Sequence, residues 1–345
     1  MFCRHRVVVV VPCYDVAPHL VDVVSTLPAF VDHVVVVDDG SRDDFAAAAS
    51  AIRSDRVTVV RHPHNLGLAR AMESGIREAL RAGADIVVKV DGDGQMDPDE
   101  MARLVGPVAA GDADLAKGNR LMRRRHVAGM PQARLAGNLL LSVLAKFASG
   151  YWNVSDPSNG YLAIRRELLE EVELDRLGPR YFFETSLLCE ANLAGAVVRE
   201  VSMPARYGAE RSSLSVRAAA TGFPFLLLRA CLRRVALRHF LRDFTPVALF
   251  FVVGAALVTL GATYGLRAWL HHSALGEPTP AGTIAVAGLP VIAGFQLLLQ
   301  ALVLDIGSVP ARSPWAGAPS GRHGVEVEEG SDRNETALVE HGRRG

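Results

Sequence analysis

Two long apolar stretches in the C-terminal third limit what this chain can fold into more than any other feature. They run from Phe244 to Leu266 and from Thr283 to Ile306, and neither contains a Lys, Arg or Glu. About 20 apolar residues are enough for a helix to cross the hydrocarbon core of a bilayer. We therefore predict two transmembrane helices. The alternative is a pair of buried hairpin helices in a soluble domain, although such helices usually show a polar stripe.

Positive charge is unevenly placed around these stretches. The connection from His271 to Gly282 has no Lys or Arg, whereas several arginines precede the first stretch, namely Arg229, Arg233, Arg234, Arg238 and Arg242. Short cytoplasmic segments are enriched in positive charge. We therefore predict that the N-terminal domain and both termini are cytoplasmic.

The N-terminal half alternates short β-branched runs with segments of helical composition. The runs are Val7 to Val11, Val34 to Val37, Val57 to Val60 and Ile86 to Val90, and the shorter Leu115 to Gly118 follows as a further strand. Helices are expected over Asp44 to Ile52, Gly67 to Ala82 and Pro98 to Ala110, with Asp97 as the N-cap of the last. This alternation predicts an α/β domain built on a mostly parallel sheet.

The composition divides the chain into four predicted parts. They are the α/β domain over residues 1–213, juxtamembrane amphipathic helices over 214–243, the two spans within 244–306, and a disordered cytoplasmic tail over 307–345. The second part is basic on one side and apolar on the other, which is typical of a helix lying flat on a membrane; the alternative is a continuation of the globular core. The 37 basic and 37 acidic residues balance, so no nucleic-acid partner is indicated.

Chemistry-bearing residues follow four of the predicted strands. Strand ends of a parallel sheet meet along one edge, where ligands bind, so these segments are expected to share a cleft. The segments are Pro12-Cys13-Tyr14-Asp15, Asp38-Asp39-Gly40-Ser41, Asn65-Leu66-Gly67 and Asp91 to Gln95. Asp38 or Asp39 would accept hydrogen bonds from a nucleotide base or ribose. Taken alone, Asp-Asp-Gly-Ser is most often a solvated turn.

The segment Asp91-Gly92-Asp93-Gly94-Gln95 is the most specific of the four. Asp91, Asp93 and Gln95 offer the oxygen ligands that Mg²⁺ or Mn²⁺ prefers, and the two glycines allow a diphosphate to approach the backbone. An EF-hand loop would need Gly and Glu where Met96 and Ala102 stand. A plain surface turn is the remaining alternative.

Together these motifs resemble family 2 glycosyltransferases, most closely the dolichol-phosphate mannose synthase type with C-terminal membrane helices. The resemblance also rests on Gly118-Asn119-Arg120, Asp156-Pro157-x-x-Gly160-Tyr161 and Arg211-Ser212-Ser213. It implies a GT-A fold, which is Rossmann-like with a mostly parallel sheet. It also implies a UDP- or GDP-sugar donor, a metal on Asp91, Asp93 and Gln95, and inverting transfer to a polyprenyl phosphate.

The resemblance also assigns roles to single residues. Arg120, Arg134 and Asn138 take the positions that hold the acceptor phosphate. The donor nucleotide would contact the residues at the strand ends and a late arginine, namely Pro12, Tyr14, Asp15, Asp38, Asp39, Asn65, Gly67, Asp91 and Arg211. Two further roles come from the residues and not from the resemblance. Asp156 is the candidate to orient the acceptor, or to act as general base if the acceptor is a hydroxyl; the alternative is an Asp-Pro turn with no catalytic part. Tyr207 and Arg211, on a loop after the late strand, would close over the diphosphate as a lid.

Several features depart from the family pattern and leave alternatives open. Asp15-Val16 replaces the usual Asn-Glu, and Leu68 replaces a common Lys. One alternative is a transferase whose acceptor is another lipid or a lipid-linked saccharide hydroxyl. Another is a non-catalytic, transferase-like membrane scaffold. The Gln-x-x-Arg-Trp motif of processive synthases is missing, so one sugar per cycle is expected. A homo-oligomer through the spans is also open.

Overall fold

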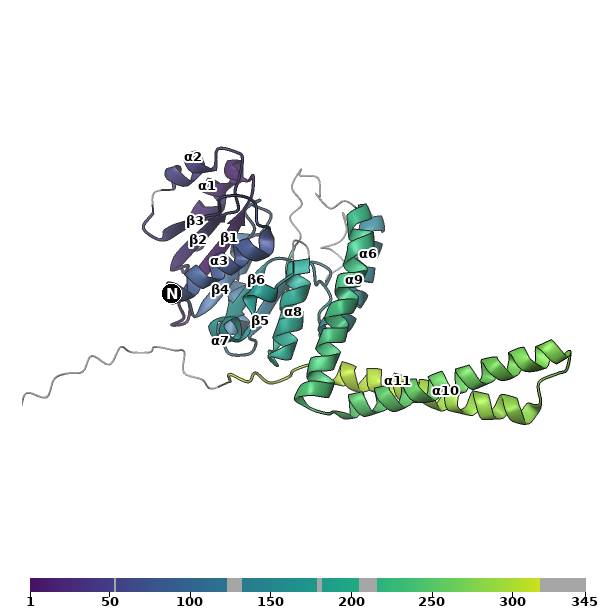
Figure 1. Cartoon of the computed structure of the whole chain (residues 1–345). Coiled ribbons are helices and arrows are strands. Elements are labelled where there is room, and N and C mark those ends of the chain that lie inside the picture. The colour runs from purple at the N-terminus through teal and green to yellow at the C-terminus, as the bar shows by residue number, and fades with distance from the viewer. Residues whose placement is uncertain (53, 123–131, 179–181, 205–215, 317–345) are drawn as a thin grey trace, which may run out of the picture.

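The computed structural model describes residues 1–316 except 53, 123–131, 179–181 and 205–215. It consists of an α/β domain, a pair of helices beside it, and a long helical hairpin that extends away from it (Figure 1). The strands are β1 (Val7–Cys13), β2 (His33–Asp38), β3 (Val57–Arg61), β4 (Ile86–Lys89), β5 (Leu115–Asn119), β6 (Leu162–Arg165) and β7 (Val198–Ser202).

The helices alternate with these strands as the sequence pattern predicts. In the α/β domain they are α1 (Ala17–Ser25), α2 (Phe45–Ala51), α3 (Leu68–Arg81), η1 (Pro98–Glu100), α4 (Met101–Ala109), α7 (Arg166–Glu171), η2 (Leu174–Arg176) and α8 (Phe183–Leu193). Beside and beyond the domain lie α6 (Gln132–Ser149), α9 (Val216–Val235), the π-helical turn η4 (Ala236–Arg242), α10 (Pro246–Leu275) and α11 (Ala281–Gly307). The side chain of Asp97 accepts a hydrogen bond from Asp99 N, which confirms it as an N-cap.

Within the described residues, seven strands form one sheet in the order β3-β2-β1-β4-β6-β5-β7. Neighbouring strands pair in parallel, except that β6 is antiparallel to both β4 and β5. The sheet is therefore mostly parallel, as expected. Because β6 runs the other way, the loop that leads into it lies at the carboxyl edge of its neighbours.

The strands are continuous apolar runs because both faces of the sheet are covered. Along β1, Val8 and Val10 face a core formed with α3 and α8, whereas Val7, Val9 and Val11 face a core formed with α1, α2 and α4. All five valines are fully buried. The motif-bearing loops therefore extend from a rigid base.

The two predicted spans are present as helices. α10 and α11 are each long and apolar enough to cross a membrane, and they pack against each other as an antiparallel hairpin (Figure 1). Glycines allow the close contact: a Cβ on Gly254 would lie 2.8 Å from the carbonyl oxygen of Gly294, and one on Gly294 would lie 2.6 Å from that of Gly254. The hairpin begins and ends beside the α/β domain, so the domain and residues 308–316 lie at the same end of it.

The predicted juxtamembrane segment forms α9, which packs against the domain on one face. One face of α9 packs with α6 and α8 around Leu227, while Phe225, Leu228 and Leu232 are exposed. The helix lies crosswise to the hairpin (Figure 1). Several arginines of α9 and η4 contact protein, which differs from the expectation of a basic face on the membrane. Arg233 pairs with Glu190 and Arg234 with Asp305, and in η4 Arg238 and Arg242 donate to Asn192 and Leu193, whereas Arg229 is exposed.

The tail prediction is wrong for the residues directly after α11. Val309 and Trp315 pack against the core of the α/β domain. Ser313 Oγ donates to Asp114 Oδ1 over 2.6 Å. Residues 308–316 are therefore ordered against the domain, and residues 317–345 lie outside the described part.

Candidate active site

The loops after β1 and β2 are tied together by short hydrogen bonds. Asp39 N donates to Cys13 O over 2.8 Å. Asp15 N donates to Ser41 Oγ over 3.1 Å, and Arg42 N donates to Asp15 Oδ1 over 2.7 Å. Asp15 adopts a left-handed backbone conformation with φ of 54°. The predicted convergence of these strand ends is therefore present, with Asp15 exposed, Tyr14 half-buried and Pro12 buried.

Asp39 connects the loop after β2 to the loop after β3. Its buried carboxylate accepts hydrogen bonds from Leu66 N and Gly67 N, at 2.9 and 2.8 Å, and lies 2.8 Å from His62 Nδ1. Gly40 allows the loops after β2 and β3 to approach closely, because a Cβ there would lie 2.5 Å from the backbone of His64. This leaves the exposed Asn65 at the carboxyl edge.

Asp38 is also turned inward. It is fully buried, accepts from Ser41 N over 2.8 Å and lies 3.0 Å from Arg61 Nε. Both carboxylates are buried and shape the loops that would surround a nucleotide. Direct contact of Asp38 or Asp39 with the nucleotide remains a prediction.

The Asp91 to Gln95 segment packs on the end of β1. A Cβ on Gly92 would lie 3.1 Å from Cys13 Sγ and 3.3 Å from Pro12 O. Asp93 Oδ1 accepts from Gln95 N over 3.0 Å. Asp91 is partly exposed, and its Oδ1 lies 2.5 Å from Lys89 Nζ. All four strand-end segments therefore meet, as predicted.

The donor atoms in this segment fit a hard divalent cation. Two carboxylates and one amide oxygen lie within five residues, and Mg²⁺ commonly uses one or two carboxylates together with substrate phosphates. No group of three or more His, Cys, Asp or Glu side chains able to hold a metal occurs in the described part of the chain. Asp91, Asp93 and Gln95 would thus share the ion with the donor diphosphate, and this assignment remains a prediction.

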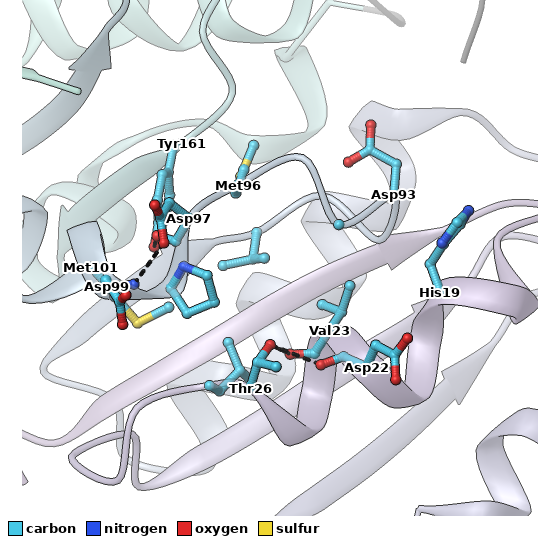
Figure 2. Close-up of a pocket in the computed structure, with 14 residues that line it drawn as sticks. His19, Asp22, Val23, Thr26, Asp93, Met96, Asp97, Asp99, Met101 and Tyr161 are labelled. Carbon is cyan, nitrogen blue, oxygen red and sulfur yellow. Dashed lines mark hydrogen bonds between the residues drawn. The ribbon is translucent and has the colours of Figure 1, made fainter. Parts of the chain in front are cut away.

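A cavity of about 570 Å³ adjoins the same segment. It lies between α1 and the residues from Asp93 to Met101 (Figure 2). Asp93 and His19 lie at one end of it, while Tyr161 and Asp97 lie at the other (Figure 2). Asp91 and Gln95 are not among its lining residues. The cavity therefore borders the predicted metal segment on one side only.

The buried Asp156 and the partly exposed Arg120 form an ion pair at the same edge of the sheet. Arg120 Nε donates to Asp156 Oδ2 over 2.9 Å and Nη2 donates to Oδ1 over 3.0 Å. The backbone N of Arg120 also donates to Oδ2. Burial by itself would raise the pKa of Asp156, but the hydrogen bonds and charge of Arg120 outweigh it and hold the pKa below its usual value. Asp156 is therefore a poor general base in this arrangement.

Glu200 on β7 positions this pair, and sequence reasoning missed it. Its Oε1 accepts from Ser155 N and Asp156 N, both over 2.8 Å, and its Oε2 accepts from Asn119 Nδ2 over 2.6 Å. Burial raises the pKa of Glu200, although the hydrogen bonds from Asp156 and Ser155 partly oppose this. Glu200 thus fixes the residues on either side of the Arg120 to Asp156 contact.

Two buried lysines behind the site were also missed. Lys89 on β4 contacts Asp91, and lies 3.3 Å from Glu184 Oε1. Lys117 on β5 donates to Asn159 O. Burial alone would lower the pKa of Lys89, but the charges of Asp91 and Glu184 more than offset it, so the pKa is raised. The sequence did contain a signal for these pairs. A lysine inside an otherwise apolar strand predicts an acidic partner nearby, because fully buried lysines are almost always paired.

Three predicted ligand residues cannot be placed. The helix that carries Arg134 and Asn138 is α6, as expected, but the side chains of these two residues lie outside the described part. Arg211 lies outside the described residues altogether, as does Tyr207.

Known proteins resemble this chain. The glycosyl transferase family 2 model matches residues 8–173. Polyprenol monophosphomannose synthase of Mycolicibacterium smegmatis is 34% identical over 202 residues, which cover 57% of this chain and 76% of the relative. Dolichol-phosphate mannosyltransferase of Pyrococcus furiosus is 25% identical over 309 residues, which cover 84% of this chain and 79% of the relative.

A solved structure is also similar. Glucosyl-3-phosphoglycerate synthase from Mycobacterium tuberculosis, in complex with phosphoglyceric acid, shows 23% identity and a TM-score of 0.49; the match covers 67% of this chain and 80% of that chain. The family model spans the strand-end segments that form the site, and the M. smegmatis relative is 34% identical over 76% of its own length. The chain belongs to glycosyl transferase family 2.

Proposed function

We propose that this glycosyltransferase moves one hexose, with inversion, from a UDP- or GDP-sugar to a polyprenyl phosphate in a membrane. Several similar proteins bear names that support this acceptor. They include the mannose synthase from M. smegmatis, the mannosyltransferase from P. furiosus and an undecaprenyl-phosphate mannosyltransferase from Micrococcus luteus, which is 28% identical over 201 residues.

The ion pair between Asp156 and Arg120 is the observation that carries the proposal. A hydroxyl acceptor needs a base, whereas a phosphate acceptor is already an anion at neutral pH. The pKa of Asp156 is lowered by Arg120, which opposes a role as base. A guanidinium held in a fixed position by a carboxylate suits the binding of a phosphate. The pair therefore favours an anionic acceptor.

The chemistry follows from this charge arrangement. A phosphate oxygen of the acceptor attacks the anomeric carbon opposite the departing nucleoside diphosphate, so the configuration inverts. Arg120 orients the attacking phosphate, and Asp156 with Glu200 holds Arg120 in place. A Mg²⁺ or Mn²⁺ on Asp91, Asp93 and Gln95 would supply charge neutralisation for the departing diphosphate.

The membrane parts complete the proposal. α10 and α11 would span the bilayer with the catalytic domain and both termini on the cytoplasmic side. The exposed apolar residues of α9 and of the adjacent α6 would then rest in the lipid surface; they are Leu139, Leu140, Val143, Leu144 and Phe147 on α6 and Phe225, Leu228 and Leu232 on α9. Such a surface would bring a lipid acceptor to Arg120. The domain limits of 1–213, 214–243 and 244–306 are part of this proposal.

The test is a transfer assay with purified, detergent-solubilised protein. UDP- and GDP-linked hexoses are screened with polyprenyl phosphate, and both transfer and hydrolysis of the sugar nucleotide are measured. We expect one donor to yield a lipid product that mild acid cleaves, as a glycosyl phosphodiester should. An acid-stable product would instead support a hydroxyl acceptor, and absence of nucleotide binding with Mn²⁺ would support a non-catalytic scaffold.

Two variants separate the predicted roles. Arg120→Lys should lower transfer by about 10- to 100-fold, because it loses a charge-assisted bidentate contact. Its affinity for the nucleoside diphosphate should stay unchanged.

Asp93→Ala should abolish transfer and weaken Mn²⁺-dependent nucleotide binding. Full activity of Asp93→Ala would refute the metal assignment.

A further inference from the structure

A buried carboxylate joins the second span to the catalytic domain. Asp305, in the last turn of α11, accepts from Arg234 Nη1 and Nη2 over 2.7 and 3.0 Å. Trp152 Nε1 donates to it over 3.3 Å, and His239 Nε2 lies 3.0 Å from it. The carboxylate is thus contacted from α9, from η4 and from the loop after α6. Four contacts to one buried acidic group define a specific junction.

Arg234 extends this junction to the end of α6. It is 1% exposed, and its Nε and Nη2 donate to Ala148 O and Phe147 O, both over 3.1 Å. Gly150 makes room for it, since a Cβ there would lie 2.8 Å from Arg234 Nη1. One guanidinium therefore connects the carboxyl ends of α6 and α11, where the helix dipoles favour a cation.

Neighbouring contacts fix the same two parts in place. Arg238 donates to Ser308 O over 2.6 Å, directly after α11, and to Asn192 O over 3.2 Å, at the end of α8. The segment then returns to the domain, where Ser313 contacts Asp114. The hairpin is therefore attached to the domain before α10 and after α11.

One loop carries both a contact of this junction, Trp152, and the active-site residue Asp156. Trp152 lies four residues before Asp156, in a loop whose other contacts are also short. Asn153 Nδ2 donates to Val198 O over 3.1 Å, and Glu200 holds the backbone of Asp156. A shift of Asp305 relative to the domain would therefore move the loop that positions Arg120.

Helix length gives a reason for such a junction. At 1.5 Å per residue, the 30 residues of α10 and 27 residues of α11 extend about 45 and 40 Å, which is longer than the hydrocarbon core of about 30 Å. Helices of this length can tilt or slide in a bilayer. The length of the helices therefore does not fix how far the domain lies above the membrane surface. The phosphate of a membrane lipid, in contrast, lies at a fixed depth.

We propose that Asp305 is a positioning residue: with Arg234 and Trp152 it holds the catalytic domain at one height and angle, so that Arg120 meets the phosphate of an acceptor embedded in the bilayer. This inference rests on the proposed function. A buried ion pair often adds little net stability compared with apolar residues, so its contribution here is the defined geometry.

The experiment compares two acceptors in proteoliposomes, using the sugar nucleotide found active in the screen. One is undecaprenyl phosphate embedded in the vesicles, and the other is the water-soluble geranyl phosphate added outside. Asp305→Ala should lose about 100-fold in kcat/KM with the embedded acceptor, the loss expected for a misplacement of about 1 Å, and about twofold or less with the soluble one. Trp152→Phe, which keeps the ring but not the donor, should show a smaller loss of the same kind.

Matched variants guard against simple misfolding. Arg234→Met combined with Asp305→Leu removes both charges of this ion pair together, and should fold yet still discriminate against the embedded acceptor. Asp243→Asn removes an exposed carboxylate at the same junction and should have no effect. A fluorophore on the exposed Cys3 gives a readout besides activity. Quenchers attached to the lipid headgroups report the distance between this fluorophore and the membrane surface, and that distance should change in the double variant.

The outcomes are distinct. Equal losses on both acceptors, or no loss on either, in Asp305→Ala and in the double variant would overturn the positioning role. An unchanged quenching distance in the double variant would do the same. If the wild-type enzyme transfers to neither acceptor, the proposed function fails, whatever the variants do.

Discussion

At the scale of single residues, the site depends on charges that are buried and paired. Lys89 is 1% exposed and lies between Asp91 and Glu184. Such a cation keeps two acidic side chains close to the proposed diphosphate site. Removing one partner of a buried pair is costly, because it leaves the other charge uncompensated.

Lys89→Met should therefore destabilise the protein by about 3 kcal/mol, equivalent to a fall in Tm of about 10 °C. Lys89→Met combined with Glu184→Met should lose less than the sum of the two single variants, because both charges are then absent. Thermal unfolding of the solubilised protein measures both effects. Additive losses would show that the two side chains are not coupled.

Lys117 should give the protein a pH-dependent stability. Burial lowers its pKa from 10.5 to about 8, so the folded chain loses this proton before the unfolded chain does. Between pH 8 and 10.5 the unfolded state binds more protons, and the contribution of Lys117 to the free energy of unfolding rises with pH. Lys117→Met should remove this rise, whereas Lys146→Met, a half-buried lysine on α6, should keep it. Chemical unfolding at several pH values compares the slopes.

At the scale of elements, loop packing positions the segments of the proposed donor site. The loops after β2 and β3 meet where Gly40 has a φ of 73° and its hydrogen faces the backbone of His64. Two separate costs therefore oppose a side chain there: a left-handed backbone conformation and a steric clash. Gly111 has a similar φ of 77°, but a Cβ there would meet no other atom within 4 Å.

Gly111→Ala should thus cost about 1 kcal/mol of unfolding free energy, and Gly40→Ala clearly more. Gly40→Ala should also weaken nucleotide binding, because it displaces the loop that ends at Asn65 and Gly67. Calorimetric titration with UDP and GDP tests this. Equal behaviour of the two variants would indicate that the contact with His64 does not matter.

Most of these elements could be predicted because their patterns are local. The β-branched runs that precede each motif became β1 to β5, and Asp97 became a cap as its position before Pro98 indicated. The direction of β6 could not be predicted, since pairing with β4 and β5 decides it. The ordered segment 308–316 was missed because its few anchors, Val309, Ser313 and Trp315, find their partners only in the folded domain.

At the scale of the whole molecule, hydrogen bonds and ion pairs join the hairpin to the domain before α10 and after α11. Three of the arginines that the sequence suggested would face lipid, Arg234, Arg238 and Arg242, instead bind the ends of α6, α8 and α11. The proposed cytoplasmic position of the domain therefore needs its own test, independent of arginine counts.

The native cysteines make that test direct. Cys3 is exposed on the catalytic domain, so a membrane-impermeant maleimide should label it only in permeabilised cells. Glu277→Cys, made in a Cys3→Ser background, places a thiol in the exposed connection between α10 and α11 and should be labelled in intact cells. The opposite labelling pattern would invert the proposed topology.

The amino-acid sequence by itself determined the α/β alternation, the two apolar helices and the loops that meet at the sheet edge, because short-range periodicity and strand-end position encode them. The tertiary structure decided which charged residues act on one another. Asp38 and Asp39 turn inward, Lys89 and Glu200 support the site, and Arg234 reaches Asp305 seventy-one positions away. Pairing of buried charges depends on distances between distant segments, and these are set only when the sheet, the helices and the hairpin pack together.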